Sequence, residues 1–304
     1  MVAPSESLVN SDFCALCGGA SVVWTRRGDR ELRRCRLCSF AWVPQGLARN
    51  ASGASIYDAA EPFFMDVEQA DYYLDEGAVD AARAKRAWVE RFVPAGARLL
   101  DVGANVGYFV REASDRYHAT GIEPSPSVVA WGREHLGANL QVGSIDEEDE
   151  MLVGKCDAVT MFDVIEHLGD PRAALARCRR YLSPGGHLFI STPDAGSAAA
   201  AVMGSRWHYV DLVQHVSLFG SSNLASLLRE TGFTIVERRT FGRRYRFSYI
   251  ARRLRELSAG NSLLRAASVP AQLLRLWPSA HVALNLGDVM GLVARRADAT
   301  RGGG

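Results

Sequence analysis

Long apolar runs, a basic leader and abundant cysteine are all missing from this chain of 304 residues. Because no run of about eighteen or more uncharged apolar residues occurs, we expect no membrane-spanning helix. The opening segment, MVAPSESLVNSDF, has neither a basic start nor an apolar stretch, so we expect no signal peptide and a soluble, cytoplasmic protein. Six cysteines are too few for a disulfide-dense secreted domain, and 48% hydrophobic residues exclude a disordered chain. The length suits one large domain with an appendage, or two domains.

Lysine is nearly absent as well, since Lys85 and Lys155 are the only two among 35 basic residues. The net charge of +1 hides an asymmetry: residues 241–304 contain eleven arginines and three acidic residues, a net of +8, which leaves −7 for the remainder. A basic tail on an acidic body is typical of proteins that bind nucleic acid, membranes or anionic substrates. Arginine-rich helix faces in solvent are the alternative, and the general arginine bias keeps both interpretations open.

Four of the six cysteines form two C-x-x-C pairs, Cys14-Ala-Leu-Cys17 and Cys35-Arg-Leu-Cys38, separated by 17 residues. This spacing is typical of a four-cysteine zinc ribbon, because two short chelating turns can present four thiolates to one tetrahedral zinc at about 2.3 Å. The alternatives are two disulfides, which a cytoplasmic location disfavours, and unrelated cytosolic thiols. Four thiolates leave no open position on the metal, so we predict structural zinc in a module spanning residues 1–50.

Short apolar runs alternate with helical patterns beyond a helical linker at residues 51–94, and this alternation predicts a parallel sheet covered by helices on both faces. The expected strands are Arg98–Val102, His118–Ile122, Leu140–Val142, Ala158–Phe162 and His187–Ser191, followed by Phe233–Arg239 and Val289–Ala294. The expected helices are Ala78–Phe92, Val106–Arg116, Ser127–His135, Pro171–Tyr181 and Ser221–Glu230.

The loop after the first of these strands reads D-x-G-x-N-x-G, with Asp101 leading Gly103, Asn105 and Gly107. It is neither the G-x-G-x-x-G of a dinucleotide site nor a P-loop. A leading carboxylate suits a cationic ligand better than a pyrophosphate, and Glu123, at the end of the second strand, can accept hydrogen bonds from two ribose hydroxyls. A ligand with a ribose and a cationic amino-acid tail is S-adenosylmethionine.

Residues 95–240 resemble the class I S-adenosylmethionine-dependent methyltransferases, in particular the branch with the ubiquinone-biosynthesis O-methyltransferases. Four motifs carry the resemblance, in this order: LLDVGANVG, GIEPS, FDVIEHLGDP and LSPGGHLFISTP. It implies an α/β fold with a Rossmann-like seven-stranded methyltransferase sheet over residues 95–304. To this we add the N-terminal zinc ribbon and a helical insertion, residues 242–286, before the last strand.

The resemblance also implies roles for residues in the four motifs. Asp101, Gly103 and Gly107 would border the methionine part of the cofactor, with Asn105 where many members have glycine. Glu123 would hold the ribose. The adenine side would be lined by Pro124, Ser144 and Ile145, and the segment from Asp163 and Val164 to Glu166 would close the other side. For Asp163, a helix cap is the alternative role; for Glu166, it is a position in solvent.

Three histidines are candidates for the general base that removes a proton from an acceptor hydroxyl. His215, which precedes Phe219 in a pattern similar to the family's, is the first choice. His167, in the EHL that follows the fourth strand, is the second, and His208 is the third. A hydrogen-bonded structural histidine is the alternative for each of them.

An oxygen acceptor is favoured over carbon or nitrogen, so we predict O-methylation of a small-molecule, glycan or lipid-linked hydroxyl. DNA amino-methyltransferases usually have an acidic residue or Asn followed by Pro-Pro-aromatic after the fourth strand, and this chain has Phe162-Asp163-Val164-Ile165 there. The Pro-Cys nucleophile of pyrimidine C5 methylation is also missing. Both observations disfavour a nucleic acid as the methyl acceptor. The alternatives are an RNA methyltransferase using the zinc ribbon and the arginines, a sugar C-methyltransferase, and a non-catalytic cofactor-binding protein. The sequence carries no signal for the oligomeric state.

Most of the basic tail belongs to the insertion at residues 242–286. Six leucines recur there at roughly helical spacing: Leu254, Leu257, Leu263, Leu264, Leu273 and Leu274. A basic amphipathic insertion can dock on an anionic membrane or a lipid-linked glycan, which would place the protein peripherally at the inner face of the membrane. It can equally cover the sheet edge with its arginines in solvent.

Overall fold

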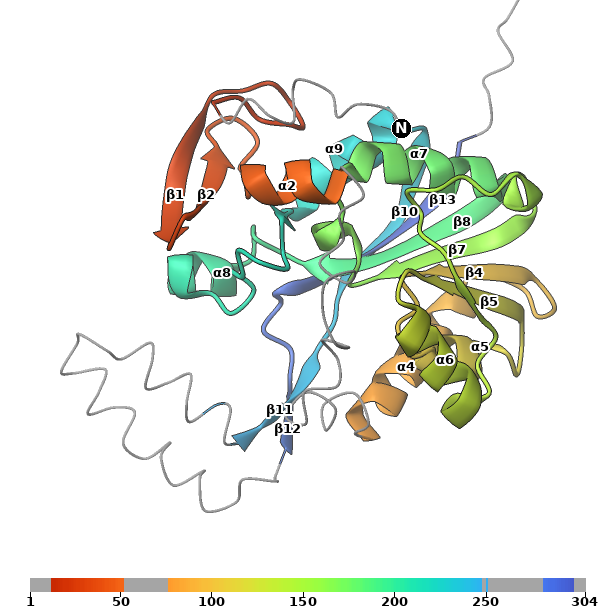
Figure 1. Cartoon of the computed structure of the whole chain (residues 1–304). Helices are drawn as coiled ribbons and strands as arrows, with labels where there is room; N and C mark the ends of the chain where they lie inside the picture. Colours follow the sequence, from red (N-terminus) through yellow and green to blue (C-terminus); the bar gives the residue numbers. More distant parts are fainter. Residues whose placement is uncertain (1–11, 52–75, 248–249, 251–280, 298–304) are drawn as a thin grey trace, which may run out of the picture.

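The computed structural model describes residues 12–51, 76–247, 250 and 281–297 (Figure 1). Its centre is a seven-stranded sheet in the order β10-β13-β8-β7-β4-β5-β6, which confirms the predicted seven-stranded fold. The strands are β4 (Arg98–Val102), β5 (His118–Glu123), β6 (Leu140–Val142), β7 (Cys156–Phe162), β8 (Leu182–Pro193), β10 (Phe233–Thr240) and β13 (Val289–Arg296). Within this sheet, β13 runs antiparallel to both of its neighbours, β8 and β10.

Helices cover both faces of the sheet, as the alternation predicts. In Figure 1, α4 (Glu76–Val89), α5 (Tyr108–Ala113) and α6 (Pro126–Leu136) lie on one face, and α7 (Pro171–Tyr181) and α9 (Ser221–Glu230) lie on the other. Buried apolar side chains fill both layers, with Trp88, Phe109 and Val129 in the first and Leu175, Leu224 and Leu227 in the second. The shorter helices are α2 (Pro44–Ala51), α8 (Ala198–Met203), η1 (Glu150–Leu152), η2 (Ile165–His167) and η3 (Gly204–Arg206).

A second, antiparallel sheet has the order β1-β2-β3-β9. The first cysteine pair precedes β1, and the second pair begins at the last residue of β2. Its strands are β1 (Ser21–Arg27), β2 (Arg30–Cys35), β3 (Ala41–Trp42) and β9 (Ser217–Leu218). The fourth strand comes from a distant part of the chain, so the N-terminal module is completed by a segment that follows β8.

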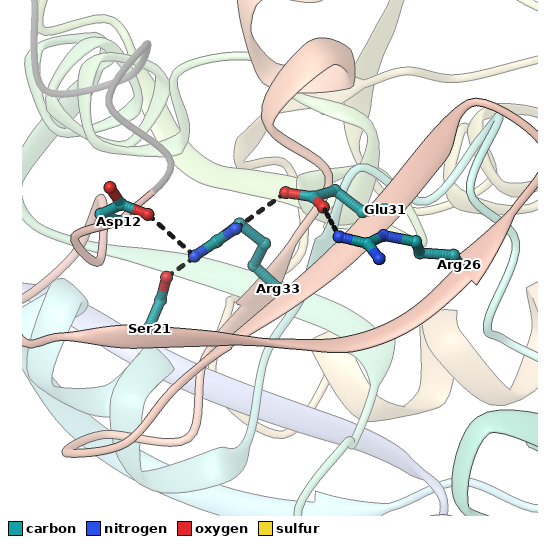
Figure 2. Close-up of polar contacts among 5 residues, drawn as sticks. All are labelled: Asp12, Ser21, Arg26, Glu31 and Arg33. Carbon is teal, nitrogen blue, oxygen red and sulfur yellow. Dashed lines mark hydrogen bonds and ion pairs between the residues drawn. The ribbon is translucent and has the colours of Figure 1, made fainter.

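Figure 2 shows the polar contacts that tie the β1–β2 hairpin together. The Arg33 guanidinium donates to Glu31 Oε1 at 2.8 Å, to Asp12 Oδ1 at 3.1 Å and to Ser21 Oγ at 2.9 Å. Glu31 also pairs with Arg26, at 3.2 Å. Arg33 and Glu31 are 12% and 19% exposed, whereas Asp12 and Arg26 are 77% and 69% exposed, so the pair of Arg33 and Glu31 is the least solvated part of the network.

The predicted helical insertion at residues 242–286 starts and ends differently from the expectation. Its described ends are two strands, β11 (Arg243–Arg246) and β12 (His281–Leu284), which pair antiparallel. The physical reason is that β10 and β13 are themselves antiparallel neighbours, so the chain leaves and returns side by side and its backbone groups pair. All six leucines of the amphipathic pattern lie outside the described residues. Among the described helices, none is long and apolar enough to cross a membrane.

Candidate functional site

The predicted cofactor residues gather at the carboxyl edge of the parallel strands, where open α/β sheets bind ligands. Asp101 in β4 is opposite Gly121 in β5, so Glu123 stands at the end of the neighbouring strand, beside the glycine loop. The Glu123 carboxylate accepts hydrogen bonds from the Asn105 amide, at 3.0 Å, and the Ser125 amide, at 3.2 Å. Burial raises the pKa of Glu123, although both amides act against the rise. The structure therefore joins three sequence-predicted features, Asp101, Glu123 and the loop, at one edge.

Asp101, the residue that leads the glycine loop, is buried in the sheet. Its side chain is 3% exposed, and its Oδ1 accepts a hydrogen bond from Thr160 Oγ1 at 2.6 Å. Burial raises the pKa of Asp101 to about 7, although Thr160 and the nearby Lys85 charge oppose the rise. Asp101 thus links β4 to β7 through its side chain, and its contact with a cofactor stays a prediction.

Left-handed backbone at three positions gives the loop its shape. Gly103 has φ +67° and Gly107 φ +88°, and an added Cβ would lie 2.6 Å from Val164 Cγ2 or from Ala138 Cβ, respectively. Asn105 has φ 52°, which Asn tolerates better than most residues, and its Oδ1 accepts a hydrogen bond from Val106 N at 2.6 Å. The predicted residues Gly103 and Val164 are therefore in direct contact, and Asn105 adopts the conformation that glycine would.

The predicted adenine-side residues follow β5 and β6. Pro124 is half-buried at the end of β5. Ser144 is half-buried after β6, and its Oγ accepts a hydrogen bond from the Asp146 amide at 3.1 Å. Ile145 is 2% exposed and belongs to the hydrophobic core. Their contact with a cofactor stays a prediction.

Asp163 is held by two cations that sequence reasoning missed. Its carboxylate pairs with Lys85 at 3.2 Å and with Arg243 at 3.1 Å, and it accepts a hydrogen bond from Ser191 Oγ at 3.2 Å. Burial alone would raise the pKa of Asp163, but the two cations lower it well below its usual range. The side chain is thus engaged by three groups outside η2, whose first residue it does not cap. In the sequence, the scarcity of lysine was the one feature that could have drawn attention to Lys85 as a functional residue.

Two of the three candidate histidines form a pair. The rings of His167 and His215 have centroids 5.0 Å apart. His167 Nδ1 lies 2.9 Å from the Gln214 carbonyl, and His215 Nδ1 lies 2.8 Å from the Tyr209 carbonyl. We assign the proton to Nδ1 in both rings, because only an N–H can bind a carbonyl, and this tautomer leaves Nε2 as the acceptor nitrogen.

The environment keeps both rings in the neutral form that a base requires. Burial, and after it the neighbouring His215 ring, lowers the pKa of His167 to about 4. Burial also lowers the pKa of His215. Beside the pair, Glu166 is 1% exposed and accepts a hydrogen bond from Thr192 Oγ1 at 2.9 Å, which overturns its alternative position in solvent. Burial and then the Asp163 charge raise the pKa of Glu166 to about 8.

His208 has a different environment. Its Nε2 lies 3.5 Å from Asp288 Oδ2, and the same carboxylate oxygen accepts a hydrogen bond from Trp207 Nε1 at 3.2 Å. Asp288 is 1% exposed, directly before β13. This arrangement favours the structural alternative for His208, and its catalytic role stays a prediction that the pair of His167 and His215 fits better.

The low pKa of His167 predicts a loss of stability in acid. Between pH 6.5 and 4 the unfolded chain protonates this histidine and the folded chain does not, so stability rises with pH across that window. We expect acidification from pH 6.5 to 4 to cost the wild type up to ~3 kcal/mol more than His167→Gln. Urea unfolding at a series of pH values measures this, with His118→Gln as the control that should follow the wild type. Equal losses in the wild type and His167→Gln would contradict it.

The four N-terminal cysteines converge on one point. All four Sγ atoms lie within 4.8 Å of one another, with 3.6 Å between Cys14 and Cys38 and 3.5 Å between Cys17 and Cys35. A tetrahedral zinc with bonds of about 2.3 Å separates its sulfurs by roughly 3.8 Å, so the cluster fits such an ion. Burial alone would raise the pKa of Cys35, but the amides of Cys38 and Leu37, which donate to its sulfur, lower it to about 7. The other two cysteines, Cys156 and Cys178, are buried in the core.

Comparison with curated proteins finds ubiquinone biosynthesis O-methyltransferases. The one from Xanthomonas axonopodis pv. citri is 33% identical over 164 residues, 48% of this chain and 66% of the relative. The one from Xanthomonas oryzae pv. oryzae is 36% identical over 143 residues, 41% of this chain and 59% of the relative. The chain thus spans less than two thirds of the length of these relatives.

Solved structures share the fold at low sequence identity. A SAM-dependent methyltransferase from Thermotoga maritima superposes with a TM-score of 0.51 and 18% identity, over 77% of this chain and 97% of that one. Phosphoethanolamine N-methyltransferase 2 from Haemonchus contortus gives 0.52 and 15%, over 90% and 71%. Residues 78–238, more than half of the chain, match the family described as a methyltransferase domain. Together with the strand order and the glycine loop, this match establishes that the chain belongs to the methyltransferase-domain family.

Proposed function

We propose that this protein transfers a methyl group from S-adenosylmethionine to a hydroxyl group of a small-molecule, glycan or lipid-linked acceptor, with His215 as the general base. The observation that carries the proposal is the presence of two features after the parallel strands. The first is a buried carboxylate, Glu123, bound to the glycine loop. The second is the imidazole pair, whose rings are each oriented by a backbone carbonyl at Nδ1.

The loop residues fit the proposed cofactor. Glu123 can accept hydrogen bonds from two ribose hydroxyls, because each carboxylate oxygen has two lone pairs and the amides of Asn105 and Ser125 occupy one on each. Gly103, Asn105 and Gly107 have left-handed backbone conformations. At Gly103 and Gly107 the missing side chain also lets the loop backbone pack closely against Val164 and Ala138. When bound, S-adenosylmethionine supplies an electrophilic methyl group.

The histidines fit the proton removal that a hydroxyl acceptor needs. A neutral imidazole whose Nδ1 donates to a carbonyl presents Nε2 to an acceptor O–H and takes its proton as the oxygen attacks. His215 is our first choice because the Tyr209 carbonyl orients its ring and burial keeps it neutral. His167, at 5.0 Å between ring centroids, would share or replace that role.

We also propose that the four-cysteine cluster holds one structural zinc ion. Four convergent sulfurs satisfy a tetrahedral ion completely, so the metal would bind no substrate of its own. Zinc would then fix the two cysteine turns between which β1 and β2 are built.

Loss of Glu123 tests the cofactor site. We expect Glu123→Ala to weaken S-adenosylmethionine binding by roughly 10- to 100-fold, because hydrogen bonds to a charged group are worth about 1.5–3 kcal/mol. Isothermal titration measures the affinity, and a thermal unfolding curve checks that the variant is folded. Glu134→Ala, which removes an exposed carboxylate from α6, is the matched control and should bind as the wild type does. A wild type that binds no S-adenosylmethionine would sink the proposed function.

A further inference from the structure

The segment that carries His208 and His215, residues 205–219, is called the acceptor segment below. It runs from η3 through β9, between β8 and α9, and these two short elements are the only regular structure within residues 205–219, all of which the structure describes. Its neighbour is the cysteine module, defined here as residues 12–51. Backbone pairing, side-chain hydrogen bonds and a shared hydrophobic core connect the cysteine module to the acceptor segment.

Backbone pairing joins the two directly. Ala41 of β3 is opposite Leu218 of β9, and Trp42 is opposite Ser217. One residue further along, the Val43 amide donates to the Val216 carbonyl at 2.9 Å. Of the strands that the structure describes, β3 is the partner of β9, so the module supplies the ladder that orders the chain immediately after His215.

Side chains of the module cap carbonyls further back in the acceptor segment. The Arg27 guanidinium donates to the Ser205 carbonyl at 3.1 Å, and the Arg30 guanidinium donates to the Leu212 carbonyl at 3.0 Å. In the opposite direction, Asn223 Nδ2 of α9 donates to the Cys38 carbonyl at 3.1 Å. The last bond reaches a cysteine of the cluster, so the cysteine turn itself is tied to the helix that follows the acceptor segment.

A common hydrophobic core backs these polar contacts. Leu32 and Val43 of the module belong to one buried cluster with Trp207, Leu212 and Leu218 of the acceptor segment, and each of the five is at most 3% exposed. The rings of Phe40 and Phe219 pack with centroids 5.0 Å apart. An added Cβ at Gly46 would lie 2.4 Å from Val216 Cγ1, so α2 also approaches the segment as closely as its backbone allows.

The acceptor segment in turn orients the imidazole pair. The carbonyl of Tyr209 binds His215 Nδ1, and the carbonyl of Gln214 binds His167 Nδ1. His167 belongs to η2, which follows β7, so its ring direction depends on a carbonyl of a different segment. A displacement of the acceptor segment would therefore turn both rings and move both Nε2 atoms.

We propose that the cysteine module is a positioning element of the catalytic site: through β3, Arg27, Arg30 and the shared core it holds the acceptor segment, whose carbonyls aim His167 and His215. A zinc ion held by the four cysteines would then support methyl transfer through these carbonyls, and its loss would leave the cofactor loop, which follows β4 in the large sheet, unaffected. The inference rests on the proposed function for the name of the site, but the contacts can be tested without an acceptor.

Hydrogen exchange on the full chain, with and without metal, is the test. In Cys17→Ser, or in the wild type treated with a strong zinc chelator, we expect amide exchange in residues 205–219 to rise at least ~10-fold, while amides of β4, β5 and β7 stay protected. Imidazole NMR signals of His167 and His215 should shift, and that of His118 should not. The affinity for S-adenosylhomocysteine should stay within about twofold, which a general loss of folding would not allow.

A variant that keeps the cluster intact separates the contacts from the metal. Arg30→Gln should raise exchange around Leu212 and shift the His215 signal without loss of metal, and Arg30→Lys should restore part of the protection. Arg133→Gln is the matched control, since Arg133 caps the Leu140 carbonyl in the cofactor half. Unchanged exchange in residues 205–219 after metal removal, or an equal rise across the whole sheet, would overturn the inference. Failure of the wild type to bind S-adenosylhomocysteine would instead overturn the proposed function alone.

Discussion

Replacing His215 by alanine is expected to lower the rate of methyl transfer by roughly 10²- to 10⁴-fold, the usual contribution of a positioned general base. The variant removes the ring whose Nδ1 is anchored on the Tyr209 carbonyl, and with it the acceptor nitrogen that would take the hydroxyl proton. Because His215 lies on the acceptor segment, the affinity for S-adenosylmethionine should not change. Mass spectrometry of cell extracts incubated with the enzyme and methyl-labelled cofactor measures the transfer to whichever acceptor the extract contains.

Two further histidine variants serve as a control and as a test of which histidine is the base. His118→Ala removes an exposed ring at the start of β5, at the opposite edge of the sheet, and should transfer at the wild-type rate. His167→Ala should cost less than His215→Ala if His167 only supports the pair, and as much if it is the base. Wild-type activity in both His167→Ala and His215→Ala would remove the imidazole pair from the mechanism.

Replacing Cys35 by serine is expected to remove the zinc and unfold the cysteine module. Cys35 is 2% exposed, and its sulfur receives hydrogen bonds from the amides of Leu37 and Cys38, so serine can replace neither its charge nor its size. Zinc binding contributes roughly 10–16 kcal/mol in small zinc modules, and its loss should remove most of the stability of β1, β2 and β3. The zinc content, measured by elemental analysis, should fall from about one ion per chain to nearly none.

Cys156→Ala is the control for the zinc measurement. Cys156 is also buried, at 4% exposure, but it begins β7 in the large sheet, away from the cluster. This variant should keep its zinc and lose only the stability expected of a small cavity in the core. A wild type purified without zinc, or a Cys35→Ser variant with unchanged zinc content, would refute the metal assignment.

Local patterns predicted most of the large sheet and its helices. β4, β6, α7 and α9 have the predicted bounds. For α7 the sequence marks the start clearly, because Pro171 occupies the first turn of the helix. α5 begins at Tyr108 and not at Val106, because Gly107 adopts a left-handed conformation that a helix cannot include. The last two strands, β10 and β13, pair antiparallel.

Contacts between distant parts of the chain were not predictable in the same way. β9 has only two residues, too few for any period, and exists because β3 pairs with it across more than 170 positions of sequence. Lys85 of α4 and Arg243 of β11 meet at Asp163 although they lie far apart in the sequence. The ends of the insertion are strands for the same reason, since their pairing is imposed by neighbouring strands rather than by their own residues.

By itself, the sequence determined the alternation of strands and helices, the convergence of four cysteines and the identity of the glycine loop, because each depends on residues close together in the chain. Only the tertiary structure decided which histidines form a pair, which carboxylates are buried, and that the cysteine module shares a sheet and a core with the acceptor segment. The physical reason is that burial and ring orientation depend on contacts between segments far apart in sequence, and no local pattern records those contacts.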